Sequence, residues 1–291
     1  MRALAVDVGG TRVACGAVDD QELLQACSIE TDSRGYLSTL LPTIAQTLRY
    51  LRKQHAGNFA GIGFGFCGLV DSARGRVIST NHKYSDATEI DLRSWAREEF
   101  ELPLKLENDA RLALLGERHS GAAQNTDDVV IMTLGTGIGT AALMGGHLIR
   151  GKHFQAGCLG GHFTIVAEGR VCSCGARGCF EAEASTYALP DVCRTWPGFK
   201  ESALAREPRL DFVTLFRWAD GGDKVAGQIR TRCIRIWAAC AVSLIHAYDP
   251  ELLVLGGGSC GVPIRSLRQF RSTSIATRGR PGAKSGSVPL N

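Results

Sequence analysis

A short cluster of metal-ligand side chains is the most distinctive chemical feature of this sequence. Cys172, Cys174 and Cys179 follow His162 within eighteen residues, with glycines between them. Three thiolates and one imidazole make a complete tetrahedral set for zinc. Because four protein ligands leave no open position, a zinc ion here is expected to be structural, and to hold His162 and Glu181 in fixed places.

Two other interpretations of the cysteines stay open. A disulfide is disfavoured because Cys172 and Cys174 are too close along the chain to be bridged easily, and three thiols leave one over. Burial as small hydrophobic side chains would not explain this density of cysteines with glycine spacing. The chain has eleven unevenly spaced cysteines and no basic-then-apolar leader before residue 3, which favours a reducing, cytoplasmic location.

Glycine-rich turns at residues 7–11 (Asp-Val-Gly-Gly-Thr) and 135–139 (Gly-Thr-Gly-Ile-Gly) could hold phosphate. Backbone amides in such turns bind phosphate oxygens, and a carboxylate can orient hydrated Mg²⁺. Either turn alone is equally an ordinary tight hairpin, but together they could grip a nucleotide triphosphate from both sides. A Gly-Gly-Gly sequence at 256–258 would let the base and ribose approach the backbone closely. The candidate nucleotide-binding residues are Asp7, Gly9, Gly10, Thr11, Gly135, Thr136, Gly137, Gly256 and Gly257.

Asp109 is the candidate general base. It follows a strand-like run at 104–106, next to Glu107 and Asn108, and precedes a helical stretch at 110–118. A carboxylate at this point could take the proton from a substrate hydroxyl as that hydroxyl attacks phosphorus. Asn108 or Asp109 could equally serve as the cap of the helix, and the spacing alone does not decide between these roles.

Hydrophobic periodicity predicts the elements that position these groups. In the first half we expect strands at 3–8, 12–18, about 23–30, 61–66 and 77–80, and helices at 36–55 and 91–100, the latter capped by Asp91. The second half repeats the pattern of strand, glycine turn and strand, with expected strands at 128–134, 140–144 and 252–255 and a long helix at 225–248. We therefore predict two related α/β lobes facing each other across a cleft, at 1–107 and 108–271, and a poorly ordered tail at 272–291.

Composition excludes several classes of protein. With 44% hydrophobic residues and 35 glycines among 291, the chain is typical of an α/β protein rich in turns, and no apolar run approaches the ~20 residues of a membrane helix. The net charge of +4 comes from six basic residues after Glu251, without which the rest of the chain carries −2. This argues against a nucleic-acid-binding face. The basic tail could contact an acidic partner or be a solvated end.

Taken together and in order, these motifs resemble the ROK family (repressors, open reading frames, kinases). The resemblance rests on residues 7–11, 107–110 (Glu-Asn-Asp-Ala), 134–139, the His162 and cysteine set, and Glu181, and it runs from residue 3 to about 258. It implies the two-lobed, actin-like ATPase fold of hexokinases, with a structural zinc loop. It also implies phosphorylation of a hexose or an N-acetylated hexosamine by ATP and Mg²⁺, most often at the 6-OH.

The resemblance also assigns roles to residues. Asp109 becomes the general base, and the sugar contacts become Asn108, Asp109, His162 and Glu181. Asn81 falls where such kinases place a further sugar-binding asparagine. The zinc ligands become His162, Cys172, Cys174 and Cys179. The family's repressors carry a helix-turn-helix segment before the first strand, and because so few residues precede position 3 we expect none here. We further expect a homodimer or a higher homo-oligomer.

Two departures from the family pattern favour an alternative function. Where family kinases have Glu-x-Gly-His, this chain reads Ala156-Gly-Cys158-Leu159-Gly-Gly-His162, without a carboxylate between 151 and 166. A charged hydrogen bond to the sugar, worth about 1.5–3 kcal/mol, is therefore lost or supplied from elsewhere. The tail also lacks the apolar pattern of the closing strand and helices. The alternative is a sugar-binding or catalytically degenerate protein, against which the presence of Asp109 and of both phosphate turns speaks.

Overall fold

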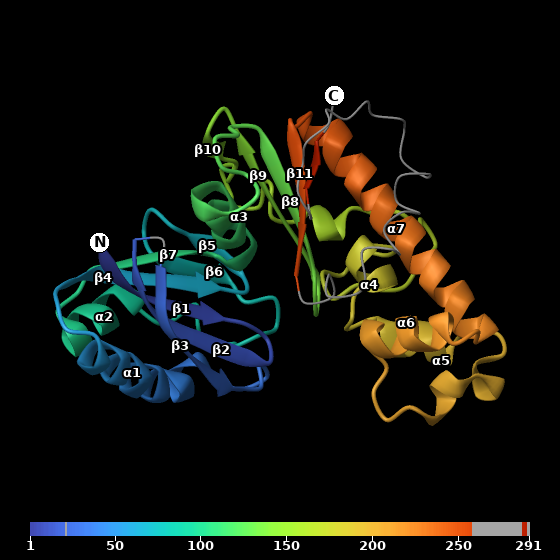
Figure 1. Cartoon of the computed structure of the whole chain (residues 1–291), viewed down its shortest axis with the longest axis horizontal. Coiled ribbons are helices and arrows are strands. Elements are labelled where there is room, and N and C mark those ends of the chain that lie inside the picture. The colour runs from blue at the N-terminus through green and yellow to red at the C-terminus, as the bar shows by residue number, and fades with distance from the viewer. Residues whose placement is uncertain (21, 258–286, 290–291) are drawn as a thin grey trace. The chain divides into compact units, whose positions relative to one another are not determined.

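The computed structural model describes residues 1–20, 22–257 and 287–289, and Figure 1 shows the elements along the chain. The chain divides into two compact units. The first comprises Met1–Ser120 together with Gly151–Gln155, and the second comprises Gly121–Arg150 and the described residues from Ala156 onward. No helix in the described part is long and apolar enough to cross a membrane.

The first unit is built on a five-stranded sheet in the order β3-β2-β1-β4-β7. Strands β1, β4 and β7 are parallel, whereas β2 and β3 return antiparallel as a meander. The strands are β1 Arg2–Val8, β2 Arg12–Asp19, β3 Glu22–Glu30, β4 Phe59–Phe66 and β7 Leu104–Asn108, and a separate hairpin contains β5 Leu69–Asp71 and β6 Arg76–Ser79.

Three helices cover this sheet, with α1 Leu37–Gln54 and α2 Leu92–Phe100 on one face and α3 Asp109–Ser120 on the other (Figure 1). Side-chain alternation explains the two faces, because successive strand residues point to opposite sides. Phe64 and Phe66 of β4 are buried in the core that α1 completes, whereas Gly65 between them approaches Leu112 of α3. Asp7 lies on the same face as Gly65, so its carboxylate points to the α3 side of the sheet.

The second unit has a sheet in the order β10-β9-β8-β11-β12. Its long helix α7 begins after Asp223, whose carboxylate accepts a hydrogen bond of 2.9 Å from the amide of Ala226. Trp237 of α7 is buried against Phe212, with ring centroids 4.8 Å apart. The elements are β8 Val129–Leu134, β9 Ile138–Met144, β10 His147–Leu148, β11 Leu252–Gly256, β12 Ser287–Pro289, α4 Phe180–Ala184, α5 Leu189–Arg194, α6 Phe212–Asp220 and α7 Lys224–Tyr248, with short 3-10 turns at Gly160–His162, Phe199–Glu201 and Ala203–Arg206.

The periodicity-based elements are found within a few residues of their expected bounds. Asp91 caps α2 as expected, since its carboxylate accepts from the amides of Arg93 and Ser94 at 3.1 Å each. The cap of α1 was not foreseen: Asp86 accepts from the amides of Leu37 and Ser38, although it lies far along the chain. Ile138 and Gly139, assigned to a turn, open β9 instead, and the sequence did not indicate β5, β10, α4, α5 or α6.

The boundary between the units differs from the expectation of 107/108. Helix α3 stays with the first unit because Leu112 packs against the β4 backbone at Gly65. Segment 151–155 also belongs to this unit, where Arg111 donates a hydrogen bond of 2.9 Å to the carbonyl of Phe154. A change in sequence pattern at 107 therefore marked the end of a strand and not the end of a folding unit.

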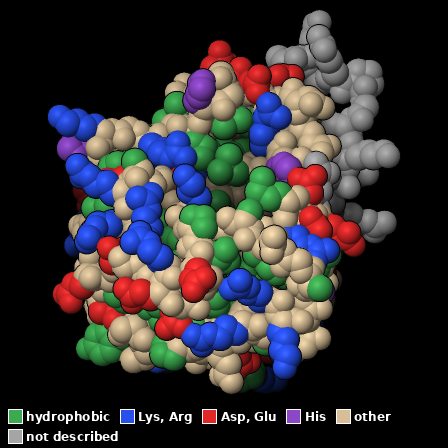
Figure 2. Space-filling model, turned by 90° about the vertical axis from the view of Figure 1, so that its left-hand side faces the viewer, with side chains coloured by type: hydrophobic (Ala, Val, Ile, Leu, Met, Phe, Trp, Pro, Cys, Tyr) green, Lys and Arg blue, Asp and Glu red, His purple; other side chains and the backbone are tan. Residues whose placement is uncertain are grey.

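The expected tail is corrected over three residues. Ser287–Pro289 form β12, whose backbone pairs antiparallel with β11. The sequence pattern did not reveal this strand because the pairing depends on backbone groups rather than on a run of apolar side chains. The rest of the predicted tail, 272–286 and 290–291, lies outside the described residues. The face turned to the viewer in Figure 2 carries basic and acidic side chains, interspersed with hydrophobic ones.

Candidate active site and metal centre

In the first unit, three parallel strands end together at one edge of the sheet. Asp7, Gly65 and Glu107 lie side by side in the register of β1, β4 and β7, and the residues that follow them sit at the carboxyl ends. This edge is where ligands usually bind to parallel α/β sheets. A Cβ added to Gly65 would lie 3.2 Å from Oδ1 of Asp7 and 3.0 Å from Leu112, so glycine leaves the room that the Asp7 carboxylate occupies.

Asn108 and Asp109 divide the two roles that the sequence left open. Asn108 caps α3, since its Oδ1 accepts from the amide of Arg111 at 3.2 Å while its Nδ2 donates to the carbonyl of Gly68 at 3.1 Å. The same Nδ2 donates to Oδ1 of Asp109 at 2.8 Å, and the amide of Ala110 donates to that oxygen at the same distance. Asp109 is therefore held in place by its neighbours and is not needed as the helix cap.

The carboxylate of Asp109 has the basicity that proton abstraction requires. Desolvation by the surrounding protein raises its pKa to about 6, and the nearby negative charge of Asp7 adds to the rise. The hydrogen bonds from Ala110 and Asn108 and the positive charge of Lys83 act in the opposite direction. Although much protein surrounds this carboxyl group, Asp109 remains exposed to solvent. Such a group is ionised near pH 7 yet more basic than an ordinary aspartate.

Glu107 has a structural role beneath this pair. It is buried and accepts hydrogen bonds from Oγ of Ser72 at 2.9 Å, from the amide of Asn108 at 3.0 Å and from Arg111 at 3.4 Å. Arg111 is itself fully buried and ties Glu107 to the carbonyl of Phe154. A buried ion pair of this kind is costly to break from one side, so Glu107 fixes the position of Asn108 and Asp109.

The Gly9–Gly10 turn and the loop that carries Asn81 are fastened to each other. The hydroxyl of Tyr84 donates to the carbonyl of Gly9 at 2.7 Å. Asn81 lies in the loop between β6 and α2, with a left-handed backbone (φ 48°). Asn81, the phosphate turn and Asp109 thus all belong to the first unit. Lys83 lies between Asn81 and Tyr84 in the same loop. The sequence analysis did not single it out, because one lysine in a polar loop carries no pattern.

In the second unit, the turn at 135–139 is closed by Glu181. The amide of Ile138 donates to Oε2 of Glu181 at 3.0 Å. A Cβ on Gly137 would lie 2.3 Å from that oxygen, so a larger residue at 137 would displace the Glu181 carboxylate from this position. The carbonyls of Gly135 and Thr136 accept from the amides of residues 186 and 187, which further fixes the turn.

The predicted glycines at the end of β11 lie next to the same turn. Strands β8 and β11 are parallel, with Gly256 opposite Thr133. Gly257 has φ of 99°, and a Cβ there would lie 2.3 Å from the carbonyl oxygen of Leu134. The structure therefore brings 134–137 and 256–257 together at the carboxyl ends of two parallel strands, as a nucleotide-binding edge requires. Gly258 lies outside the described residues.

The four expected zinc ligands converge. One donor atom from each of His162, Cys172, Cys174 and Cys179 lies within 4.8 Å of all the others. Nδ1 of His162 is 3.5 Å from Sγ of Cys172, and Sγ of Cys174 is 3.7 Å from Sγ of Cys179. A tetrahedral zinc with bonds to sulfur of about 2.3 Å places two sulfurs about 3.8 Å apart. The donor set thus fits zinc in type, number and spacing.

The segment that departs from the family pattern lies tightly against β9. Thr140 donates to the carbonyl of Gly157 at 2.6 Å and accepts from the amide of Gly160 at 2.8 Å. A Cβ on Gly161 would lie 2.0 Å from the carbonyl oxygen of Ile138. Glycine is therefore required at position 161, directly before His162, because the backbone there lies too close to the Ile138 carbonyl for any side chain. Cys158, one of the two positions at which the missing carboxylate could stand, is buried.

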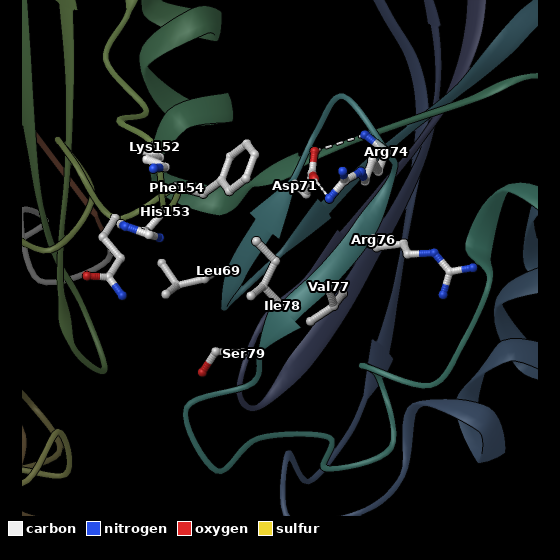
Figure 3. A pocket seen from close by; sticks show the side chains of 11 residues that line it. Leu69, Asp71, Arg74, Arg76, Val77, Ile78, Ser79, Lys152, His153 and Phe154 are labelled. Carbon is white, nitrogen blue, oxygen red and sulfur yellow. Dashed lines mark hydrogen bonds and ion pairs between the residues drawn. The ribbon is translucent and has the colours of Figure 1, made fainter.

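A cavity of about 590 Å³ lies elsewhere in the first unit, between the β5–β6 hairpin and segment 151–155 (Figure 3). Its one carboxylate among the described lining residues, Asp71, accepts from the amide of Arg74 at 2.9 Å and pairs with the Arg74 guanidinium at 3.7 Å. Leu69, Ile78 and Phe154 give it an apolar wall. Lys152 and His153 also line it. None of the residues that the sequence analysis singled out as candidate site residues lines this cavity.

Comparison with known proteins identifies the family of this chain. The model of the ROK family matches residues 3–268. A glucokinase of Thermotoga maritima is 31% identical over 89% of this chain and 82% of its own length, and a xylose repressor of Bacillus subtilis is 40% identical over 67% of this chain and 47% of its own length. The structure of a ROK family glucokinase from Streptomyces griseus, in complex with glucose and AMPPNP, superposes with a TM-score of 0.79 at 28% identity, covering 97% of this chain and 93% of that one. This chain therefore belongs to the ROK family.

Proposed function

We propose that this protein, an ATP-dependent carbohydrate kinase, transfers the γ-phosphoryl group of ATP to the 6-OH of a hexose or an N-acetylated hexosamine. The observation that carries the proposal is Asp109. Its carboxyl group has a pKa raised to about 6 and is oriented by Asn108 at the edge where the phosphate turn also lies. A glucokinase and a glucose- and nucleotide-bound structure among the relatives support the same class of reaction.

In this proposal the reaction is an in-line displacement. The sugar hydroxyl attacks the γ-phosphorus, its proton passes to the carboxylate of Asp109, and ADP leaves with the electrons of the broken bond. Asn108, His162, Glu181 and Asn81 are the proposed sugar contacts. The two glycine turns and Gly256–Gly257 are the proposed nucleotide contacts, since they present backbone amides where negative charge develops.

Two metal ions accompany the proposed reaction. Asp7 is placed to orient a hydrated Mg²⁺, which supplies charge neutralisation on the phosphates when bound. Burial raises the pKa of Asp7, an effect that Arg12 opposes, and a bound cation would favour the ionised form. Zinc at His162 and the three cysteines would fix the loop that carries Glu181. Because Nδ1 of His162 faces the thiols, its Nε2 is left to contact the sugar.

A binding protein without efficient catalysis is the second candidate. The absence of a carboxylate between residues 151 and 166 and the xylose repressor among the relatives favour it. The position and basicity of Asp109 favour the enzyme, because a protein that only binds sugar has no use for a base with a raised pKa.

Measuring ADP release separates the two candidates. The purified chain, with Mg²⁺-ATP, is assayed against glucose, mannose, fructose, allose and the N-acetylated hexosamines. We expect turnover with at least one sugar and its loss in Asp109→Asn. If calorimetry shows sugar binding but none of these sugars is turned over, the proposal of a kinase is wrong and that of a binding protein is supported.

A further inference from the structure

Lys83 lies in a short loop with an unusual backbone. Its neighbours Asn81, His82 and Tyr84 all adopt left-handed conformations, with φ of 48°, 61° and 50°. Residues with side chains rarely adopt this region, and three of them within four positions persist only where surrounding contacts dictate the conformation. The amide of Lys83 itself donates to the carbonyl of Thr80 at 2.9 Å, which closes the turn.

Several contacts hold this loop against the first phosphate turn. Tyr84 is fully buried, and its hydroxyl donates to the carbonyl of Gly9 at 2.7 Å. Its amide donates to the carbonyl of Ser33 at 2.6 Å, and the amide of Ser33 donates to the carbonyl of Gly10 at 3.1 Å. The hydroxyl and the amide of Tyr84 therefore both help to fix the position of the loop relative to Gly9 and Gly10.

The consequence is the position of the Lys83 side chain. Its Cε lies 3.9 Å from the place that a Cβ on Gly10 would occupy, so the end of the chain that bears the ammonium lies next to the turn. Among the described residues, no carboxylate lies within ion-pair distance of Lys83. Its positive charge nevertheless reaches the proposed base, since it opposes the rise that burial causes in the pKa of Asp109 and in that of Cys67.

We propose that Lys83 is a catalytic residue whose ammonium group binds the γ-phosphoryl group of ATP during transfer. This inference rests on the proposed kinase function and extends it to a residue that the family motifs do not contain. A lysine serves such a site as a compact point charge that neutralises the negative charge on the phosphoryl oxygens. Lys83 forms no covalent bond, and the sugar proton still passes to Asp109.

The proposal explains features that the other assignments leave unused. Lys83 has no carboxylate partner among the described residues, and a constrained loop holds its ammonium group between a glycine turn and the proposed base. Such a group is preorganised for an anion. A lysine with only a structural or solubilising role would not need three left-handed neighbours or a buried tyrosine to fix it. The glycine at position 10 leaves the space that the side chain approaches.

The test compares Lys83→Met and Lys83→Arg with Lys53→Met, a matched control at an exposed position near the end of α1. Thermal unfolding first establishes that each variant is folded. Calorimetry then measures the affinity for ADP and for AMPPNP, an ATP analogue with a γ-phosphate. We expect Lys83→Met to weaken AMPPNP binding at least tenfold, while its affinity for ADP stays within about threefold of the parent. Lys83→Arg, which keeps the positive charge, should lose less of its affinity for AMPPNP.

Kinetics provide the second measurement. On the best sugar, Lys83→Met should lower kcat by about 10²–10³-fold, the usual cost of removing one group that stabilises transition-state charge, with the sugar KM little changed. The apparent pKa of the acidic limb should rise, because Lys83 no longer favours the ionised form of Asp109. Equal losses for ADP and AMPPNP, or a kcat within threefold of the parent, would overturn the proposal. A parent protein inactive on every sugar would instead overturn the kinase function, and the AMPPNP comparison would still decide whether Lys83 binds the γ-phosphate.

Discussion

The amide of Ile138 donates a hydrogen bond to Oε2 of Glu181, across 3.0 Å, and so joins the glycine turn of the second unit to helix α4. The helix begins directly after Cys179, one of the converging metal ligands. The metal centre, the proposed sugar contact and the proposed nucleotide turn are therefore linked through three consecutive residues. A structural change at any one of these three sites is therefore expected to disturb the other two.

Zinc removal should act through this link. We expect about one zinc per chain by elemental analysis, and a lower zinc content, a lower Tm and a higher sugar KM in Cys174→Ser. The reason is that a structural zinc site contributes its binding energy to folding. Cys27→Ser, on β3 of the first unit, is the control and should keep its metal. A metal-free preparation with an unchanged Tm would contradict the assignment.

Asp109→Asn should abolish phosphoryl transfer. An amide keeps the shape and accepts the hydrogen bond from Ala110, but it cannot take a proton. The expected loss in kcat is about 10²–10⁴-fold, with ATP affinity by calorimetry nearly unchanged. Glu98→Gln, on the exposed side of α2, makes the same chemical change away from the site and should remain fully active. Near-normal turnover of Asp109→Asn would reduce Asp109 to a structural role.

The pH dependence of the parent enzyme should reflect the same group. Because the pKa of Asp109 is raised to about 6, the carboxyl group is protonated below that value and cannot act as a base. We expect kcat/KM to rise with pH and to level off above about pH 7. An activity that stays flat from pH 4.5 to 7 would exclude Asp109 as the titrating base.

Asp109→Asn should be more stable than the parent at neutral pH, although it is expected to be inactive. A raised pKa means that the folded protein disfavours the ionised carboxylate more than the unfolded chain does. This destabilisation is fully present above pH 6 and disappears as pH falls from about 6 to the ordinary aspartate value. Asp109→Asn should therefore raise Tm at pH 7.5 and lose that gain near pH 4, as calorimetric scans at both pH values would reveal.

The missing carboxylate before His162 can be restored at two positions with different outcomes. Leu159 is half-buried, so Leu159→Glu can place a carboxylate near the proposed sugar contact His162 at little cost in folding. Cys158 is buried, and a carboxylate there would lose its hydration, so Cys158→Glu should lower Tm. We expect Leu159→Glu to lower the sugar KM about tenfold, within the range of one charged hydrogen bond. An unchanged KM in a folded Leu159→Glu would place the lost contact elsewhere.

Much of the fold was predictable because its signals are local. Periodicity within single segments located most of the strands and the helices α1, α2, α3 and α7, and Asp91 was recognisable as a cap from its position before Leu92. Motif order indicated the family, which the match over residues 3–268 confirms. The convergence of His162 and the three cysteines was predictable for the same reason, since all four lie in one short stretch with turn-forming glycines.

Relationships between distant segments were decided only by the tertiary structure. Asp86 caps α1 across forty-nine positions, Arg111 ties segment 151–155 into the first unit, and Tyr84 fastens the Asn81 loop to Gly9. The spacing of Asn108 and Asp109 left their roles open, whereas the structure gives the cap to Asn108 and a raised pKa to Asp109. A pKa or a phosphate contact depends on which charges and how much protein surround an atom, and that neighbourhood comes into being only when strands far apart in the chain end at the same edge of a sheet.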